Sequence, residues 1–153
     1  MANTERACEI YEGICRVLDS KNWRYTRKDE DLSIILTVNG DDLAMDLIIM
    51  TDAERELVRI VSPLPFAMNE DKRIEGAIAT CAITYKLADG SFDYDLDTGK
   101  IYFRLTSSFR GGCNIGDKLL EYMVDISLYT IDKYNDQLMA LNKGYVKVES
   151  FFE

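Results

Sequence analysis

The chain has 153 residues, the length of one domain, and carries 27 acidic against 18 basic residues, a formal net charge of −9. An acidic surface repels phosphate backbones and anionic lipids, so the charge argues against nucleic acid and membrane as partners. The chain also has no histidine, which excludes Ser-His and Cys-His catalytic pairs and imidazole metal ligands.

The four cysteines and the first residues indicate the compartment. No two cysteines form a CxxC motif, and the opening residues lack the apolar region of a signal peptide. No apolar stretch approaches the ~20 residues of a membrane helix. We therefore expect a cytoplasmic protein with free thiols. Cys8, Cys15 and Cys81 are expected to be small core side chains, and Cys113, beside two glycines, to be the exposed thiol.

The N-terminal part predicts one helix followed by three or four strands. Apolar residues recur at helical spacing over 3–22. Alternation then predicts strands over 23–28, 33–38, 43–51 and 55–62. Asn39-Gly40 is the strongest short hairpin signal, and Pro63-Leu64-Pro65 is expected to end the fourth strand.

The C-terminal part predicts a helix, two strands and a long helix. The first of these helices begins at Asn69 or Glu70 and ends at Asp89-Gly90. Its predicted buried stripe consists of Ile74, Ala77, Ile78, Cys81, Ala82 and Tyr85. Strands are predicted over 92–96 and 101–105, and the long helix over about 117–143. The whole chain, 1–153, therefore predicts one α+β domain in which helices gather mainly on one face of an antiparallel sheet.

Hairpin periodicity assigns the strand residues to two faces. A turn at Asn39-Gly40 sets Leu36 opposite Leu43 and Ile34 opposite Met45, on an apolar face that belongs under the helices. In the second hairpin, Asp93 is expected opposite Arg104. The other face of the first hairpin carries more apolar surface than a solvent-facing strand normally does. Either the second helix or a loop covers that surface, or it is a dimer or client interface; its residues are Ile35, Ala44, Ile48 and Met50.

Two segments only approximate ligand-binding motifs. Asp93, Asp95 and Asp97 have the spacing of a calcium loop, but Arg104 stands where a bidentate glutamate is required. The glycines from 111 to 116 have phosphate-loop spacing, but Asp117 replaces the phosphate-binding lysine. We therefore predict no metal, no cofactor and no catalytic residue. Free backbone N–H groups at the start of the long helix favour a weak anion site there, with Arg110, Gly111 and Gly112.

Several segments resemble the YbjN family of bacterial sensory-transduction regulators. They are Asp89-Gly90-Ser91-Phe92-Asp93-Tyr94-Asp95, Asp97-x-Gly99-x-Ile101-x-Phe103-Arg104, and Thr130-Ile131-Asp132-Lys133-Tyr134. The resemblance covers nearly the whole chain in topology and about residues 70–145 in detail. That family is similar in fold to the type III secretion chaperones, which are small, acidic and dimeric and bind an extended client segment. The resemblance therefore implies a homodimer and a client protein, and it offers no catalytic residue to transfer.

These observations predict a non-enzymatic, chaperone-like or regulatory module that binds a client protein. The candidate partner-binding residues are Ile35, Ile48, Met50, Leu64 and Phe66. The alternative is a small-molecule sensor or an unrecognised enzyme. Its site would lie between the long helix and the sheet, or in the loop 110–114.

Overall fold

The computed structural model describes residues 2–153, and its elements follow the predicted order. The helices are α1 (Ala2–Ser20), α2 (Arg73–Lys86) and α3 (Asp117–Asn142). The strands are β1 (Thr26–Lys28), β2 (Ser33–Asn39), β3 (Ala44–Asp52), β4 (Leu57–Ala67), β5 (Ser91–Tyr94) and β6 (Lys100–Ser108). Short 3₁₀ turns are η1 (Glu70–Lys72), η2 (Arg110–Gly112) and η3 (Val148–Phe151). The predicted α+β class is confirmed.

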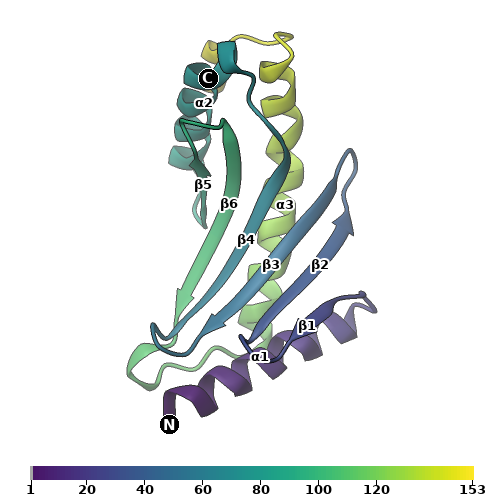
Figure 1. Ribbon diagram of the computed structural model, residues 1–153, viewed down its shortest axis with the longest axis vertical. Helices are drawn as coiled ribbons and strands as arrows, with labels where there is room; N and C mark the ends of the chain where they lie inside the picture. The colour runs from purple at the N-terminus through teal and green to yellow at the C-terminus, as the bar shows by residue number, and fades with distance from the viewer. Residues whose placement is uncertain (1) are drawn as a thin grey trace.

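The strands form one antiparallel sheet in the order β1-β2-β3-β4-β6-β5. In Figure 1, α3 runs behind this sheet, α2 lies at one end beside β5, and α1 crosses the other end. Among the described residues, no helix lies on the sheet face toward the viewer. The core therefore lies between the helices and one face of the sheet; it includes Ile14, Leu18, Ile34, Leu47, Ile49, Ile60, Phe103, Val124, Ile131 and Leu138.

The predicted strand faces are right, although the predicted registers are wrong. Leu36 lies opposite Leu47 rather than Leu43, because the hairpin closes through the longer loop 40–43. Gly40 N donates to Leu43 O across this loop at 2.9 Å. In the second hairpin, Asp93 lies opposite Tyr102, and its ion pair with Arg104 (2.8 Å) is diagonal. Both registers are shifted by an even number of residues, which leaves every side chain on its predicted face.

The fourth strand does not end at the two prolines. β4 continues through Pro63 and Pro65 to Ala67. β3 pairs with β4 only as far as Val61, so this later part of β4 has no β3 partner, and its register against β6 shifts between Pro63 and Ala67. Proline lacks a backbone N–H and is tolerated at such edges and irregularities.

The predicted orientation of α2 is also wrong. Its buried residues are Gly76, Ala79, Thr80 and Ile83. A Cβ at Gly76 would lie 2.7 Å from Met68 Cγ and 2.8 Å from the Tyr94 hydroxyl oxygen. The small-residue side therefore packs closely on the protein, and the larger side chains of the predicted stripe, Ile74, Ile78 and Tyr85, are exposed.

The thiols follow a different pattern from the predicted one. Cys15 is buried, whereas Cys8 and Cys81 are exposed together with Cys113. All four are free. Along residues 2–153, none of the helices has the length and apolar character needed to cross a membrane.

Candidate partner-binding surface

The helix-free face of the sheet carries a row of apolar side chains. Ile35 on β2 lies opposite Ile48 on β3, and Ile48 lies opposite Val61 on β4. Met50 follows on the same face of β3, opposite Ser33 and Arg59. Ile35, Ile48, Met50 and Val61 are all half-buried. The sequence thus placed three of these residues together and missed Val61, because nothing in it set the register between β3 and β4.

Leu64 and Phe66 do not join this row. Leu64 is only 7% exposed and belongs to the core, because it alternates with Pro63 and Pro65 and points toward the helices. Phe66 is half-buried and packs against the core near the far end of β4. Both residues line a separate hollow of about 370 Å³ that also includes Tyr102. Leu64 is therefore a core residue, not the exposed partner contact that the sequence suggested.

Three residues of the apolar row, without Val61, form the floor of an open hollow of about 770 Å³ that Thr4 and Cys8 of α1 border at one end. Ile35, Ile48 and Met50 line this hollow together with Leu32 and Ala53. Its charged lining residues are Lys28, Asp29, Glu30, Asp31 and Asp52. These are four carboxylates against one ammonium, so the rim is acidic. The carboxylates meet because β2 begins and β3 ends at the same end of the sheet.

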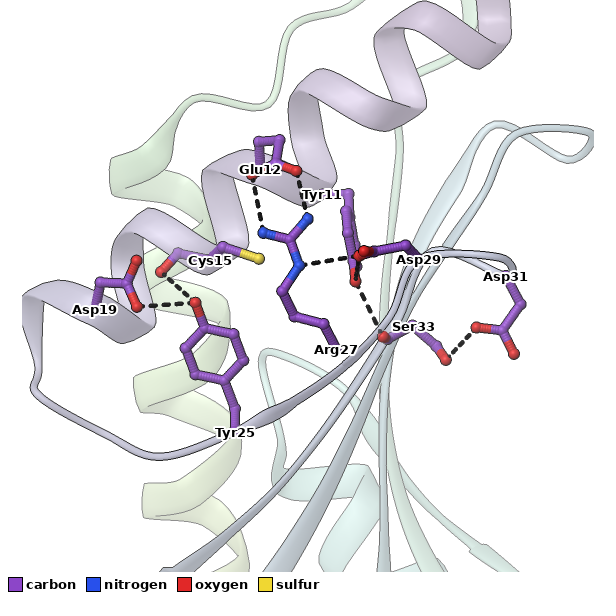
Figure 2. A network of polar contacts seen from close by, with 9 residues as sticks. All are labelled: Tyr11, Glu12, Cys15, Asp19, Tyr25, Arg27, Asp29, Asp31 and Ser33. Carbon is purple, nitrogen blue, oxygen red and sulfur yellow. Dashed lines mark hydrogen bonds and ion pairs between the residues drawn. The ribbon is translucent and has the colours of Figure 1, made fainter.

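A network between α1 and β1 fixes part of this rim (Figure 2). Arg27 reaches from β1 to Glu12 on α1 with both terminal nitrogens, at 2.5 and 3.2 Å. Its Nε donates to Asp29 Oδ1 at 2.9 Å. The hydroxyl of Tyr11 donates to the same oxygen at 2.8 Å. The short strand β1, with three exposed residues, is therefore held to α1 through the side chain of Arg27.

The same contacts shift two pKa values. The hydrogen bonds from Tyr11 and Arg27 lower the pKa of the Asp29 carboxyl. Burial, helped by the hydrogen bond to Asp29, raises the pKa of Tyr11 to about 12. Asp29 thus keeps its negative charge, and Tyr11 its proton, over the physiological pH range. Asp31, another carboxylate of the rim, accepts a hydrogen bond from Ser33 Oγ.

The loop predicted to bind an anion lies outside the hollow on the sheet face. Arg110, Gly111 and Gly112 form η2, and Arg110 Nε donates to Arg55 O at 3.1 Å. In the first turn of α3, Asp117 accepts two hydrogen bonds of 2.9 Å from Arg16. These bonds lower the pKa of Asp117, so a carboxylate of the chain already lies at this helix start. An added anion there stays a prediction.

The other predicted location for chemistry, between α3 and the sheet, is filled by side chains. The α3 residues buried there include Leu120, Val124, Leu128, Ile131 and Leu138. Among the residues whose side chains the structure describes, no three His, Cys, Asp or Glu side chains are grouped to hold a metal ion.

The comparisons with known proteins point to a fold. No protein-family model and no curated protein matches the sequence. Among solved structures, the crystal structure of YbjN from E. coli is similar with a TM-score of 0.60 and 13% sequence identity. The match covers 82% of this chain and 91% of that chain. The chain has a YbjN-like fold. YbjN is described as a proposed transcription regulator, and at this identity the similarity extends to the fold alone.

Proposed function

We propose that this protein is a non-enzymatic regulatory module that binds an extended, basic segment of a client protein on the helix-free face of its sheet. The observation that carries the proposal is the apolar floor of Ile35, Ile48 and Met50 beside an acidic rim. Half-buried apolar side chains on a sheet gain free energy when a partner removes them from water. The free thiols are consistent with action in the cytoplasm.

The charge of the rim selects the chemistry of the client. Asp29 is paired with Arg27 and Asp52 with Arg55, so the negative charge of the rim rests on Glu30 and Asp31, which attract cationic groups and repel anionic ones. The net charge of −9 acts in the same direction over a longer distance. An extended segment fits a floor built from pleated strands, because its side chains alternate toward the floor and toward the rim. The expected client segment therefore alternates apolar residues with lysine or arginine.

The test measures binding of two fluorescent peptides of equal length by anisotropy. One alternates leucine with lysine, and the other alternates leucine with glutamate. We expect the lysine peptide to bind, with an affinity that falls as salt rises, and the glutamate peptide not to bind. Equal binding of the two peptides, or no binding of either, would overturn the proposal.

Variants locate the binding surface. Ile48→Lys with Met50→Lys should abolish binding of the lysine peptide while the circular dichroism spectrum stays unchanged. Glu30→Lys, an exposed rim substitution, should weaken binding without touching the floor. Glu149→Lys at the exposed position 149 in η3, which also changes the net charge by +2, is the matched control and should bind normally. If the Ile48/Met50 variant unfolds, the Glu30 variant still decides whether the rim contacts the peptide.

A further inference from the structure

Arg59 lies beside the floor of the hollow, on the next strand of the same sheet face. On β4 it pairs with Met50 of β3 on one side and with Thr106 of β6 on the other. Its neighbours Val58 and Ile60 are buried in the core, so alternation turns the half-buried Arg59 side chain to the helix-free face. Adjacent strands are about 4.8 Å apart, so Arg59 is within reach of a segment that lies over Met50.

The guanidinium of Arg59 has no partner in the fold. Its Nε is shielded from solvent and has no hydrogen-bond acceptor among the described residues. Arg59 also takes part in no ion pair within residues 2–153. By contrast, Arg16 Nε donates to Asp117 at 2.9 Å, and Arg104 Nε lies 2.8 Å from Asp93. A buried charged donor without an acceptor costs free energy, which an incoming acceptor restores.

The carboxylates of the chain that lie near Arg59 on this face are already engaged. Asp93 of β5 forms its ion pair with Arg104. Asp52, at the end of β3, forms an ion pair with Arg55. The acceptor for Arg59 must therefore come from a bound partner.

We propose that Arg59 binds a glutamate or aspartate side chain of the client segment, an inference that rests on the proposed function. The binding surface then has charges of opposite sign on two sides. Glu30 and Asp31, in the turn before β2, attract a lysine or arginine of the client. Arg59 attracts a carboxylate from β4, two strands away from β2 and therefore about 10 Å across the sheet. A client with these two charges exchanged meets like charge on both sides and is rejected.

The geometry of a guanidinium suits a carboxylate better than any other acceptor. Nε and one terminal nitrogen donate two parallel hydrogen bonds to the two carboxylate oxygens. The chain itself forms this arrangement at Arg16, whose Nε and Nη2 each lie 2.9 Å from an oxygen of Asp117. Beside an apolar floor, less water competes for the donors, which strengthens the pair. A lysine ammonium at position 59 would keep the charge but lose the two-bond geometry.

A glutamate scan of the lysine peptide tests this contact. Each lysine in turn is replaced by glutamate, in peptides with amidated C-termini, and binding is measured by anisotropy. At one position the affinity should rise roughly tenfold, the size expected of a charge-assisted pair, although the peptide loses positive charge. At the other positions affinity should fall. The peptide with glutamate at the favoured position is called the Glu peptide.

The readout for variants is the ratio of the affinities for the Glu peptide and the lysine peptide, because a merely structural effect changes both by the same factor. Arg59→Gln should abolish the preference for the Glu peptide, and Arg59→Lys should retain part of it. Arg73→Gln is the matched control, since Arg73 is also half-buried with an unpartnered Nε but lies at the start of α2. Arg73→Gln should keep the full preference.

The outcomes separate this inference from the proposed function. If the lysine peptide binds but no glutamate position gains affinity, or if the gain persists in Arg59→Gln, the role of Arg59 is wrong and client binding stands. If no peptide binds, both are wrong.

Nuclear magnetic resonance of the wild-type chain tests the contact even if the Arg59 variants misfold. The Nε–H resonance of Arg59 should shift when the Glu peptide is added at saturation, because a hydrogen bond to a carboxylate forms there. The lysine peptide should leave that resonance close to its free position. An equal shift with both peptides, or no shift with either, would overturn the assignment.

Discussion

Ile48 and Ile49 are adjacent in β3, yet they lie on opposite faces of the sheet. Ile49 is 1% exposed and packs in the core beneath the helices. Ile48 is half-buried in the row between Ile35 and Val61, on the face where the structure places no helix over residues 2–153. Two side chains of identical chemistry therefore report separately on the core and on the proposed docking surface.

Alanine at these two positions should have unequal effects on stability. Ile49→Ala removes methylene groups from a packed core and should cost about 2–5 kcal/mol. Ile48→Ala removes surface that is still partly hydrated and should cost about 1 kcal/mol or less. Urea denaturation of both variants measures the two values. Equal costs would mean that Ile48 is a core residue, and the client-binding surface would then be absent.

Two glycines with nearly the same positive φ provide a second matched pair. Gly99 has φ +73° and Gly144 has φ +74°. A Cβ at Gly99 would lie 2.5 Å from the carbonyl oxygen of Met68, whereas a Cβ at Gly144 would have open space. Gly99 O also accepts a hydrogen bond of 2.8 Å from Met68 N, which ties the β5–β6 turn to the chain entering α2.

Gly144→Ala should therefore lower the free energy of unfolding by about 1–2 kcal/mol, the cost of a positive φ for a residue with a Cβ. Gly99→Ala has the same conformational cost and must also displace the backbone of Met68. Its loss of stability should therefore be clearly larger. Chemical denaturation in urea compares them directly. A Gly99→Ala protein as stable as Gly144→Ala would contradict the packing of the turn on Met68.

The sequence determined the element order and the strand faces but not the register or the orientation of α2. Strand faces depend on alternation alone, so the longer loop at Gly40–Leu43 changed the partners of Leu36 without changing its face. Alternation carries no information about which strands beyond a hairpin become neighbours. For that reason Val61 could not be placed beside Ile48.

Periodicity could not predict which side of α2 is buried, because both sides of the helix are apolar. One side offers Ile74, Ile78 and Tyr85, and the other offers Ala79 and Ile83 with Gly76. Side-chain volume predicts that the set with Ile74, Ile78 and Tyr85 is buried. In the structure the smaller set is buried instead, because Gly76 allows Met68 and Tyr94 to approach the helix backbone.

Thiol labelling tests where the cysteines lie. Cys15 is buried, and burial raises the pKa of its thiol, so both access and ionisation slow its reaction with maleimide. Cys8 and Cys113 should react fast and Cys15 slowly, as followed by mass spectrometry of peptides. Cys81 is exposed as well and should also react fast. Fast labelling of native Cys15 would contradict the contact between α1 and the sheet.

The loop 40–43 and α3 bring four carboxylates together, and this gives a prediction about pH. Asp41 N donates to Asp132 Oδ1 at 3.1 Å. The hydrogen bond and charge of Asp42, followed by burial and the charges of Asp132 and Asp41, raise the pKa of Asp136. A raised carboxyl pKa means that the folded protein holds this proton more tightly than the unfolded chain does. Stability from this group is therefore present at low pH and is lost as pH rises through the folded pKa.

Asp136→Asn removes the charge that costs stability, so it should raise the melting temperature at neutral pH. At about pH 3, below the ordinary aspartate pKa, Asp136 is protonated in both states and the advantage should disappear. Glu54→Gln, at an exposed carboxylate in the β3–β4 turn, is the control and should show no such pH-dependent gain. A gain for Asp136→Asn that is the same at both pH values would assign its effect to hydrogen bonding of the amide. A loss at neutral pH would mean that the four carboxylates are not close enough to repel one another.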